Sequence, residues 1–315
     1  MKSSAMSIFE MIQLRNVYSA ANILGESAIW HAASKRLLWI DLYVPRLFIH
    51  DPDSEKTEVH EIKLRGPLGA IVATTDPDIL MITHADGISS LHITSGKTKL
   101  FAHPEAGRDA VIYNDCKVDR WGRLWVGTSH AKEKETRGAL WCVLSDGSCY
   151  LGDVGFAISN GPAFSLDGRV MYFNDSLGRQ TLAYDIAADD PYPRNRRVLV
   201  SYDAEEGLPD GLTVDSEDNL WVAHWGGSRI TRISPQGARL ETISIPAPHV
   251  TTVGFGGLDL GTLYVTTARD GVSEDQIHNF PQSGDLFSLH PNAKGVAEVL
   301  FPYDNSNRRL NHPLG

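Results

Sequence analysis

The sequence predicts an all-β fold, a six-bladed β-propeller with four-stranded blades around a central channel. Three observations support this prediction. Long amphipathic helical patterns are almost absent, short apolar segments end in turns rich in Asp, Asn and Gly, and one arrangement of strands recurs along the chain. Successive repeats begin about 43 to 50 residues apart, close to the length of a propeller blade, about 40 to 45 residues. A β-sandwich would also contain short strands, but not matched repeats at a steady period.

Each repeat begins with a short apolar strand, turns through Asp, Gly or Asn, and continues into a strand rich in Leu, Trp, Tyr and Val. The repeats begin with GESAIW from Gly25, LGAIVA from Leu68, NDCKVD from Asn114, NGPAFS from Asn160, DGLTVD from Asp210 and VGFGGL from Val253. Tryptophans at matching positions of three repeats are expected to pack within the blades; these are Trp39, Trp125 and Trp221. Aspartates in three turns are expected to tighten the hairpins; these are Asp119, Asp167 and Asp215.

The repeats predict a single domain that spans residues 1–315, with residues 1–17 and 304–315 as peripheral tails. A ring has to join its ends if it is to leave no open sheet edge. We therefore expect the closing blade to combine a segment before Gly25 with strands after Gly284. A closed propeller can exist alone, so we expect a monomer or a weak homo-oligomer.

The composition excludes several classes of function. The 315 residues include 39 acidic and 29 basic ones, for a net charge of −10, and no long basic run suggests nucleic-acid binding. The chain has no stretch of about 18 apolar residues that would predict a membrane span. Its N-terminus lacks the apolar core of a signal peptide. The three cysteines have neither disulfide-framework nor metal-ligand spacing. We expect a cytoplasmic protein without nucleic-acid or membrane partners.

The beginnings of four repeats carry oxygen donors. They are Glu26, Asn114 with Asp115, Asn160 and Asp210. The first strand of each propeller blade lines the channel, so these side chains should converge at one mouth of it. Buried carboxylates without basic partners repel one another, and a divalent cation removes that penalty. Oxygen ligands suit Ca²⁺, Mg²⁺ or Mn²⁺, whereas Zn²⁺ more often recruits His or Cys. Taken singly, Asn114-Asp115, Asn160-Gly161 and Asp210-Gly211 could be ordinary turn residues, and Glu26 could be a solvated carboxylate.

In these segments the chain resembles the senescence-marker-protein, gluconolactonase and luciferin-regenerating-enzyme family over nearly its whole length. The matching segments are LGESAIW, YNDCKVDRWGRLWVGT, ISNGPAFSLDGRVMYFNDS, GLPDGLTVDSEDNLWVAHWGG and VTTVGFGG. The resemblance implies a six-bladed propeller that binds one divalent metal ion in its channel and hydrolyses lactones of sugar acids. It places the metal ligands on Glu26, Asn160 and Asp210. It also makes Asn114 the residue that contacts metal-bound water and substrate.

Two departures from the family pattern point to a different lactone. Ile112 stands where animal members have a substrate-binding Arg, and Lys132 stands where a substrate-holding Glu is expected. Lys132 could attract an anionic substituent, although a solvated charged loop is the simpler interpretation. His224, at the end of the segment NLWVAH, could contact sugar hydroxyls from the channel wall, or it could be a packed residue at a strand end.

The resulting hypothesis is a lactonase in which a metal ion polarises the carbonyl and Asp210 acts as general base on a water molecule. A serine hydrolase is disfavoured, because the chain has no Gly-x-Ser-x-Gly elbow. A propeller that binds calcium or a partner without catalysis is the alternative from another class, since one fold hosts many functions. A hydrolase for other esters also remains open.

Overall fold

The computed structural model describes residues 13–304. Within this range the chain forms 24 β-strands, the short α-helix α1 (Glu274–Asn279) and the 3₁₀ turn η1 (Ala204–Glu206). No helix between residues 13 and 304 is long and apolar enough to cross a membrane. The predicted all-β class is confirmed.

Four of the sheets contain four antiparallel strands each, and in all four the strands lie in chain order. One contains β2 (Gly25–His31), β3 (Arg36–Asp41), β4 (Arg46–Asp51) and β5 (Lys56–Glu61). The next contains β6 (Leu68–Ala73), β7 (Ile79–His84), β8 (Gly87–His92) and β9 (Thr98–Ala102). The third contains β10 (Val111–Val118), β11 (Leu124–His130), β12 (Gly138–Val143) and β13 (Cys149–Phe156). The fourth contains β14 (Ser159–Phe164), β15 (Val170–Asp175), β16 (Gln180–Ala187) and β17 (Asp190–Ser201).

The remaining sheet contains eight strands and consists of two four-stranded units. The first unit contains β18 (Leu208–Val214), β19 (Leu220–Trp225), β20 (Arg229–Ile233) and β21 (Arg239–Ser244). The second contains β22 (His249–Gly256), β23 (Thr262–Ala268), β24 (Leu286–Leu289) and β1 (Arg15–Tyr18). A single residue pair, Trp225 with His249, connects the two units.

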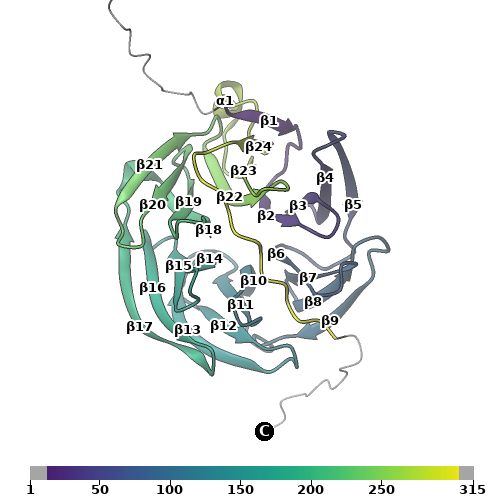
Figure 1. The fold of residues 1–315 in the computed structure, drawn as a ribbon, viewed down its shortest axis with the longest axis vertical. Helices are drawn as coiled ribbons and strands as arrows, with labels where there is room; N and C mark the ends of the chain where they lie inside the picture. The colour runs from purple at the N-terminus through teal and green to yellow at the C-terminus, as the bar shows by residue number, and fades with distance from the viewer. Residues whose placement is uncertain (1–12, 305–315) are drawn as a thin grey trace, which may run out of the picture.

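The four-stranded units are arranged around a common centre (Figure 1). Their innermost strands contact one another in the order β2, β6, β10, β14, β18, β22 and back to β2. The outermost strands face solvent, as the many exposed residues of β5 and β21 show. This arrangement is that of a β-propeller, and it brings the beginnings of the sequence repeats together at the centre.

The last four-stranded unit combines strands from the two ends of the described chain. β1 pairs antiparallel with β24, and Arg15 lies opposite Ser288. Tyr18 packs edge-on against Trp39 and Phe48, with ring centroids 6.0 and 6.2 Å away. This contact partly buries one side of β1, which begins inside the stretch 1–17 that the sequence analysis treated as a peripheral tail. Residues 305–315 of the other tail lie outside the described residues.

Tryptophan side chains form the centres of three blades, as predicted. Trp39, Trp125 and Trp221 are fully buried. The indole N–H of Trp125 donates to Oδ2 of Asp119 at 2.8 Å, and that of Trp221 donates to Oδ2 of Asp215 at 3.0 Å. Each aspartate therefore tightens a turn and also satisfies a buried donor that would be costly to leave unpaired.

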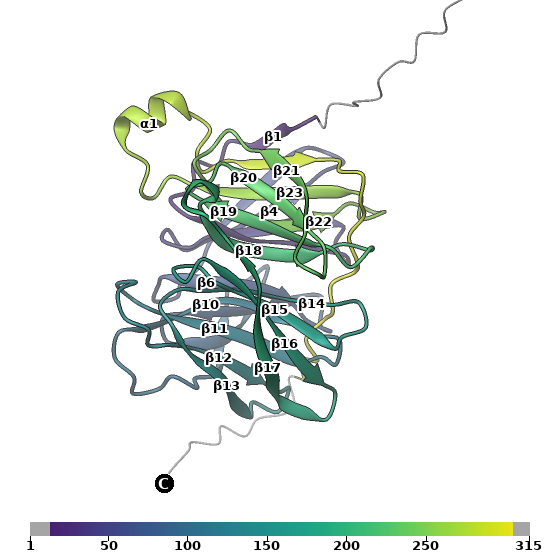
Figure 2. The same cartoon turned by 90° about the vertical axis from the view of Figure 1, so that its left-hand side faces the viewer.

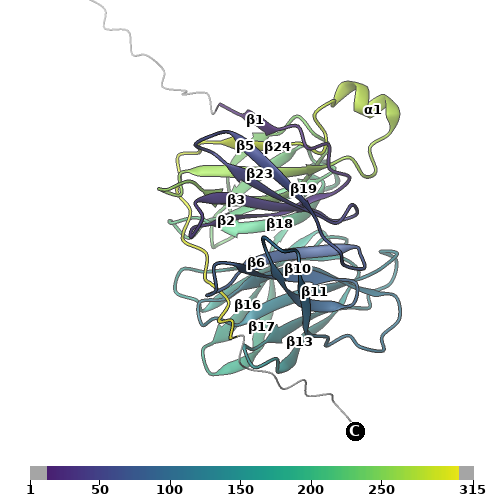
Figure 3. The ribbon, with the colours of Figure 1, turned by 90° about the vertical axis from the view of Figure 1, so that its right-hand side faces the viewer.

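The two ends of the ring differ. The loop that contains α1 projects at one end, and residues 290–304 run along the other (Figures 2 and 3). There the chain crosses the centre of the ring (Figure 1). The N–H of Gly295 donates to the carbonyl of Leu260 at 2.8 Å, and the N–H of Phe301 donates to the carbonyl of Ala73 at 3.0 Å. This C-terminal segment therefore crosses one end of the channel.

Candidate functional site

A β-bulge interrupts the innermost strand of each unit near the point where its sequence repeat begins. The pairing with the second strand shifts between Glu26 and Ile29, Leu68 and Ile71, Tyr113 and Cys116, Asn160 and Ala163, Pro209 and Leu212, and Val250 and Val253. A bulge leaves its extra residues unpaired and redirects their side chains. Asn160-Gly161 and Asp210-Gly211 lie in two of these bulges, which explains why turn-like residues stand within the strands.

Gly161 shows why the bulge of β14 requires glycine. Its φ is +83°, a value that favours glycine. A Cβ atom at this position would also lie only 2.3 Å from Cδ2 of Leu212 on the neighbouring blade. Gly161 therefore allows the backbone to turn beside the channel, directly after the candidate ligand Asn160.

Asn160 is buried and its amide group is held at both ends. Its Nδ2 donates to Oγ of Ser176 at 2.9 Å, and Ser176 donates in turn to the carbonyl of Pro209 at 2.7 Å. Its Oδ1 accepts a hydrogen bond from Nδ2 of Asn114 at 2.8 Å. Because the donor side of the amide is satisfied by Ser176, the oxygen is the atom that remains available to a ligand.

Glu26 and Asp210 are the two buried carboxylates at the beginnings of β2 and β18. They are 6% and 5% exposed. Glu26 accepts a hydrogen bond from the hydroxyl of Thr252 and one from the backbone N–H of Ser27 at 3.3 Å. The backbone carbonyl of Asp210 accepts from Nδ2 of Asn174. The side chain of Glu26 and the backbone of Asp210 are therefore each held by a residue of a neighbouring blade.

The channel carboxylates disfavour one another's ionisation. Burial and then repulsion from Asp115 raise the pKa of Glu26 to about 8. Burial raises the pKa of Asp115 to about 6. Burial, followed by repulsion from Glu26 and Asp115, raises the pKa of Asp210 well above its usual value. Three carboxyl groups thus share a low-dielectric space in which their negative charges lack sufficient compensation.

The donor set fits a hard divalent cation. Between residues 13 and 304, no three side chains of His, Cys, Asp or Glu are placed to share one metal ion. The donors that the sequence analysis predicts, the carboxylates of Glu26 and Asp210 and the amide oxygen of Asn160, all belong to buried residues. Oxygen-only sets that include an amide are typical of Ca²⁺, Mg²⁺ and Mn²⁺. A cation there would also offset the repulsion between the two carboxylates.

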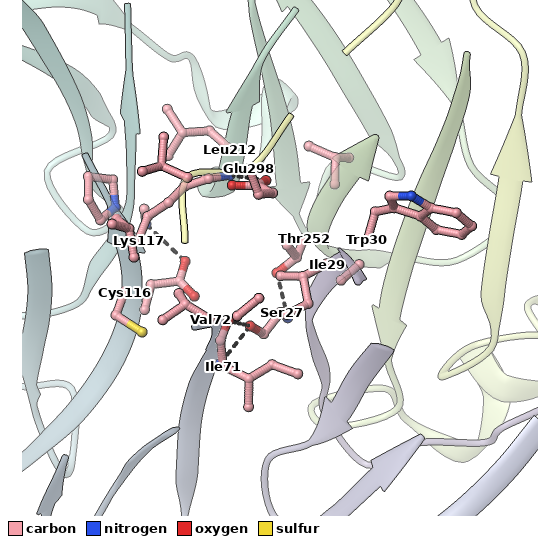
Figure 4. A pocket seen from close by; sticks show the side chains of 18 residues that line it. Ser27, Ile29, Trp30, Ile71, Val72, Cys116, Lys117, Leu212, Thr252 and Glu298 are labelled. Carbon is pink, nitrogen blue, oxygen red and sulfur yellow. Dashed lines mark hydrogen bonds and ion pairs between the residues drawn. The ribbon is translucent and has the colours of Figure 1, made fainter. Parts of the chain in front are cut away.

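The channel contains a small cavity of about 40 Å³ (Figure 4). Its polar lining includes Ser27, Asp115, Lys117, Thr252 and Glu298. Nζ of Lys117 lies 3.0 Å from Oε1 of Glu298, which belongs to the C-terminal segment. The cavity is large enough for a few water molecules at most.

The other predicted residues lie in different environments. Ile112 is partly buried on β10, two positions before Asn114 and opposite Ser129. Lys132 is exposed in the loop between β11 and β12. The neighbouring Glu133, which the sequence analysis missed, is close enough to contribute to the raised pKa of Asp210. The charge of an acidic side chain in this loop therefore reaches Asp210. No local sequence pattern indicates that Glu133, and not Lys132, is the loop residue that does so.

His224 is fully buried, and its ring lies edge-on to Tyr202 with centroids 5.3 Å apart. Burial lowers its pKa to about 4. These contacts are those of a packed residue at a strand end, and a contact of His224 with sugar hydroxyls stays a prediction. Thr252, in contrast, contacts Glu26 directly, and only its place beside the repeat that begins at Val253 could have indicated it.

Comparisons with known proteins identify the family of the chain. Residues 24–269 match the SMP-30/Gluconolactonase/LRE-like region. The chain is 32% identical to 6-deoxy-6-sulfogluconolactonase of Pseudomonas putida, covering 91% of this chain and 98% of that protein. It is 31% identical to regucalcin of Xenopus laevis, covering 92% and 98%. A solved structure of the calcium-binding protein regucalcin from Agrobacterium tumefaciens superimposes with a TM-score of 0.87 at 26% identity, covering 92% and 97%. The chain belongs to the SMP-30/gluconolactonase/LRE-like family.

Proposed function

We propose that the protein is a metal-dependent lactonase that opens lactones of sugar acids to the corresponding acids. The observation that carries the proposal is that two buried carboxyl groups from different blades, those of Glu26 and Asp210, lie close enough for Glu26 to raise the pKa of Asp210. The names of relatives support the substrate class, since one is a 6-deoxy-6-sulfogluconolactonase. The proposal includes a closed ring of six blades in one domain, acting as a monomer or weak homo-oligomer in the cytoplasm.

Glu26, Asn160 and Asp210 would hold one divalent ion, with Ca²⁺, Mn²⁺, Mg²⁺ and Zn²⁺ as the candidates. When bound, the ion supplies Lewis-acid polarisation of the lactone carbonyl and stabilises the oxyanion that develops there. The calcium-binding regucalcin among the similar structures supports Ca²⁺ as the first ion to test. A nearby positive charge also favours the ionised form of Asp210, as a general base requires at neutral pH.

Asp210 acts on the water molecule. As water adds to the carbonyl carbon, the Asp210 carboxylate takes one of its protons. The ring C–O bond then breaks, and the proton passes to the departing ring oxygen, which becomes a hydroxyl group of the open acid. Asn114 orients the water or a substrate hydroxyl, while Ile112 forms an apolar part of the substrate site. No covalent enzyme intermediate is needed, so the balance is one water consumed for each lactone opened.

The test is acid release from a panel of aldonolactones. Activity should disappear on chelation and return with one or more of the four ions, after subtraction of spontaneous hydrolysis. Turnover that survives complete metal removal would contradict the mechanism. A calcium-binding propeller without catalysis is the second candidate, supported by the calcium-binding relative. It predicts tight Ca²⁺ binding with no acid release from any lactone. Faster cleavage of simple esters than of lactones would instead favour a general esterase.

A further inference from the structure

Two consecutive residues of β10 hold the bulge of the neighbouring blade from two sides. Nδ2 of Asn114 donates to Oδ1 of Asn160 at 2.8 Å and to the carbonyl of Ser159 at 2.7 Å. Oδ2 of Asp115 accepts a hydrogen bond from the backbone N–H of Gly161 at 2.9 Å. The three hydrogen bonds enclose Asn160, so that both its side chain and its following peptide are fixed by β10.

Burying the carboxylate of Asp115 only to accept this hydrogen bond would cost free energy, unless its negative charge also has a role. Asp115 is only 9% exposed and lines the channel cavity. Lys117 of the same lining offsets part of the charge of Asp115, but its ammonium group also pairs with Glu298 at 3.0 Å. A neutral side chain could accept the same hydrogen bond without burying a charge. A carboxylate accepts it more strongly and also adds negative potential where a cation would bind.

We propose that Asp115 is a positioning residue of the metal centre: its carboxylate holds the Gly161 amide and thereby fixes the direction in which Asn160 presents its oxygen. The metal part of this inference rests on the proposed function, whereas the hold on Gly161 does not. Groups that orient metal ligands from outside the coordination shell typically change metal affinity or activity by about 10- to 100-fold when they are removed.

The experiment compares Asp115→Ala with Asp115→Asn in the full-length protein. The Asn variant can still accept the Gly161 hydrogen bond, whereas the Ala variant cannot. Two readouts are taken: the affinity for Ca²⁺ and for Mn²⁺ by titration calorimetry, and hydrogen exchange of the Gly161 amide in the metal-free protein by NMR. The matched control is Asp119→Asn, a buried Asp of the same blade that binds Arg123 and Trp125 rather than the bulge.

We expect Asp115→Ala to bind both ions about 10- to 100-fold more weakly and to exchange the Gly161 amide faster than wild type. Asp115→Asn should keep slow exchange and bind the ions more tightly than the Ala variant. Asp119→Asn should lower the melting temperature but leave both readouts unchanged. Equal losses in the Asn and Ala variants, or wild-type affinity in Asp115→Ala, would overturn the inference. If wild type binds neither ion, the proposed function fails, and the Gly161 exchange alone then decides whether Asp115 holds the bulge.

Discussion

The side-chain amide of Asn114 donates a hydrogen bond to Oδ1 of Asn160 at 2.8 Å, although the two residues are 46 positions apart. They belong to the innermost strands of adjacent blades. An amide oxygen has two lone pairs, so Asn160 can accept from Asn114 and still coordinate a cation. This relationship links the residue proposed to contact water or substrate directly to a proposed ligand, and it makes the geometry of the site depend on the assembled ring.

Replacing Asp210 by Asn should abolish most of the lactonase activity. General-base catalysis typically contributes about 10²- to 10⁴-fold in rate, and the substitution also removes one proposed carboxylate ligand. We therefore expect kcat to fall by at least about 100-fold while circular dichroism remains that of wild type. The control is Asp185→Asn, a surface Asp that pairs with Arg197 on the outer strand. Equal activity of the two variants would rule out Asp210 as the base.

Metal-induced stabilisation should increase with pH. Without metal, Glu26 and Asp115 have pKa values of about 8 and about 6, both raised above their ordinary values. A raised carboxyl pKa means that the folded state holds protons that the unfolded state has lost. The stability of the metal-free protein should therefore fall as pH rises from about 4.5 towards about 8. A cation that binds the ionised groups reverses this loss.

The measurement is the shift in Tm caused by excess Ca²⁺ over chelator, at pH 5.5 and at pH 8. Taking this difference cancels the effect of buried histidines such as His224, whose lowered pKa destabilises the folded protein at acidic pH with or without metal. We expect the shift to be larger at pH 8. A change of 1 kcal/mol in the free energy of unfolding shifts Tm by roughly 2 to 4 °C in a protein somewhat smaller than this one. A shift that is independent of pH would show that metal binding does not displace these protons.

Glu133 should disfavour lactones that carry an anionic substituent. Its charge contributes to the raised pKa of Asp210, and burial and Asp270 raise its own pKa. Glu133→Gln should increase kcat/KM for an anionic lactone relative to gluconolactone by roughly 2- to 5-fold, as for a partly screened charge worth about 0.5 to 1 kcal/mol. The control is Glu135→Gln in the same loop, which removes an exposed ion pair with Arg137. Should Lys132→Gln alone lower activity on the anionic lactone, the basic residue would be the selective one.

Phe301 should anchor the C-terminal segment across the ring. Its side chain is fully buried and packs edge-on against Phe101, with centroids 5.6 Å apart. Truncation of a buried Phe to Ala typically costs about 3 to 5 kcal/mol. We expect Phe301→Ala to lower the free energy of unfolding by a similar amount in urea denaturation. The neighbouring Leu300 is 44% exposed, so Leu300→Ala should cost much less. Equal effects of the two substitutions would show that the segment is not anchored through Phe301.

Local chemistry explains what the sequence alone could predict. Strand length, turn residues and the repeat period depend on near neighbours, and they indicated the all-β class and the matching positions of Trp39, Trp125 and Trp221. The repeat also identified Asn114, Asn160 and Asp210, because residues at equivalent positions of successive blades lie at the same end of the channel. The ligand roles of these residues remain proposals.

Only the tertiary structure decided how the side chains around the channel are placed. The sequence around the strand ends did not indicate that His224 packs against Tyr202. It also did not indicate that Glu133, rather than Lys132, influences the pKa of Asp210. Nor could a local pattern show that Asp115 holds Gly161 or that the C-terminal segment crosses the ring beside Lys117. Each of these contacts joins residues that are distant in the chain, or involves one of two neighbouring loop residues and not the other. These contacts depend on the packing of the blades around a common centre and on the bulges that redirect the side chains. A local sequence pattern predicts neither of these features.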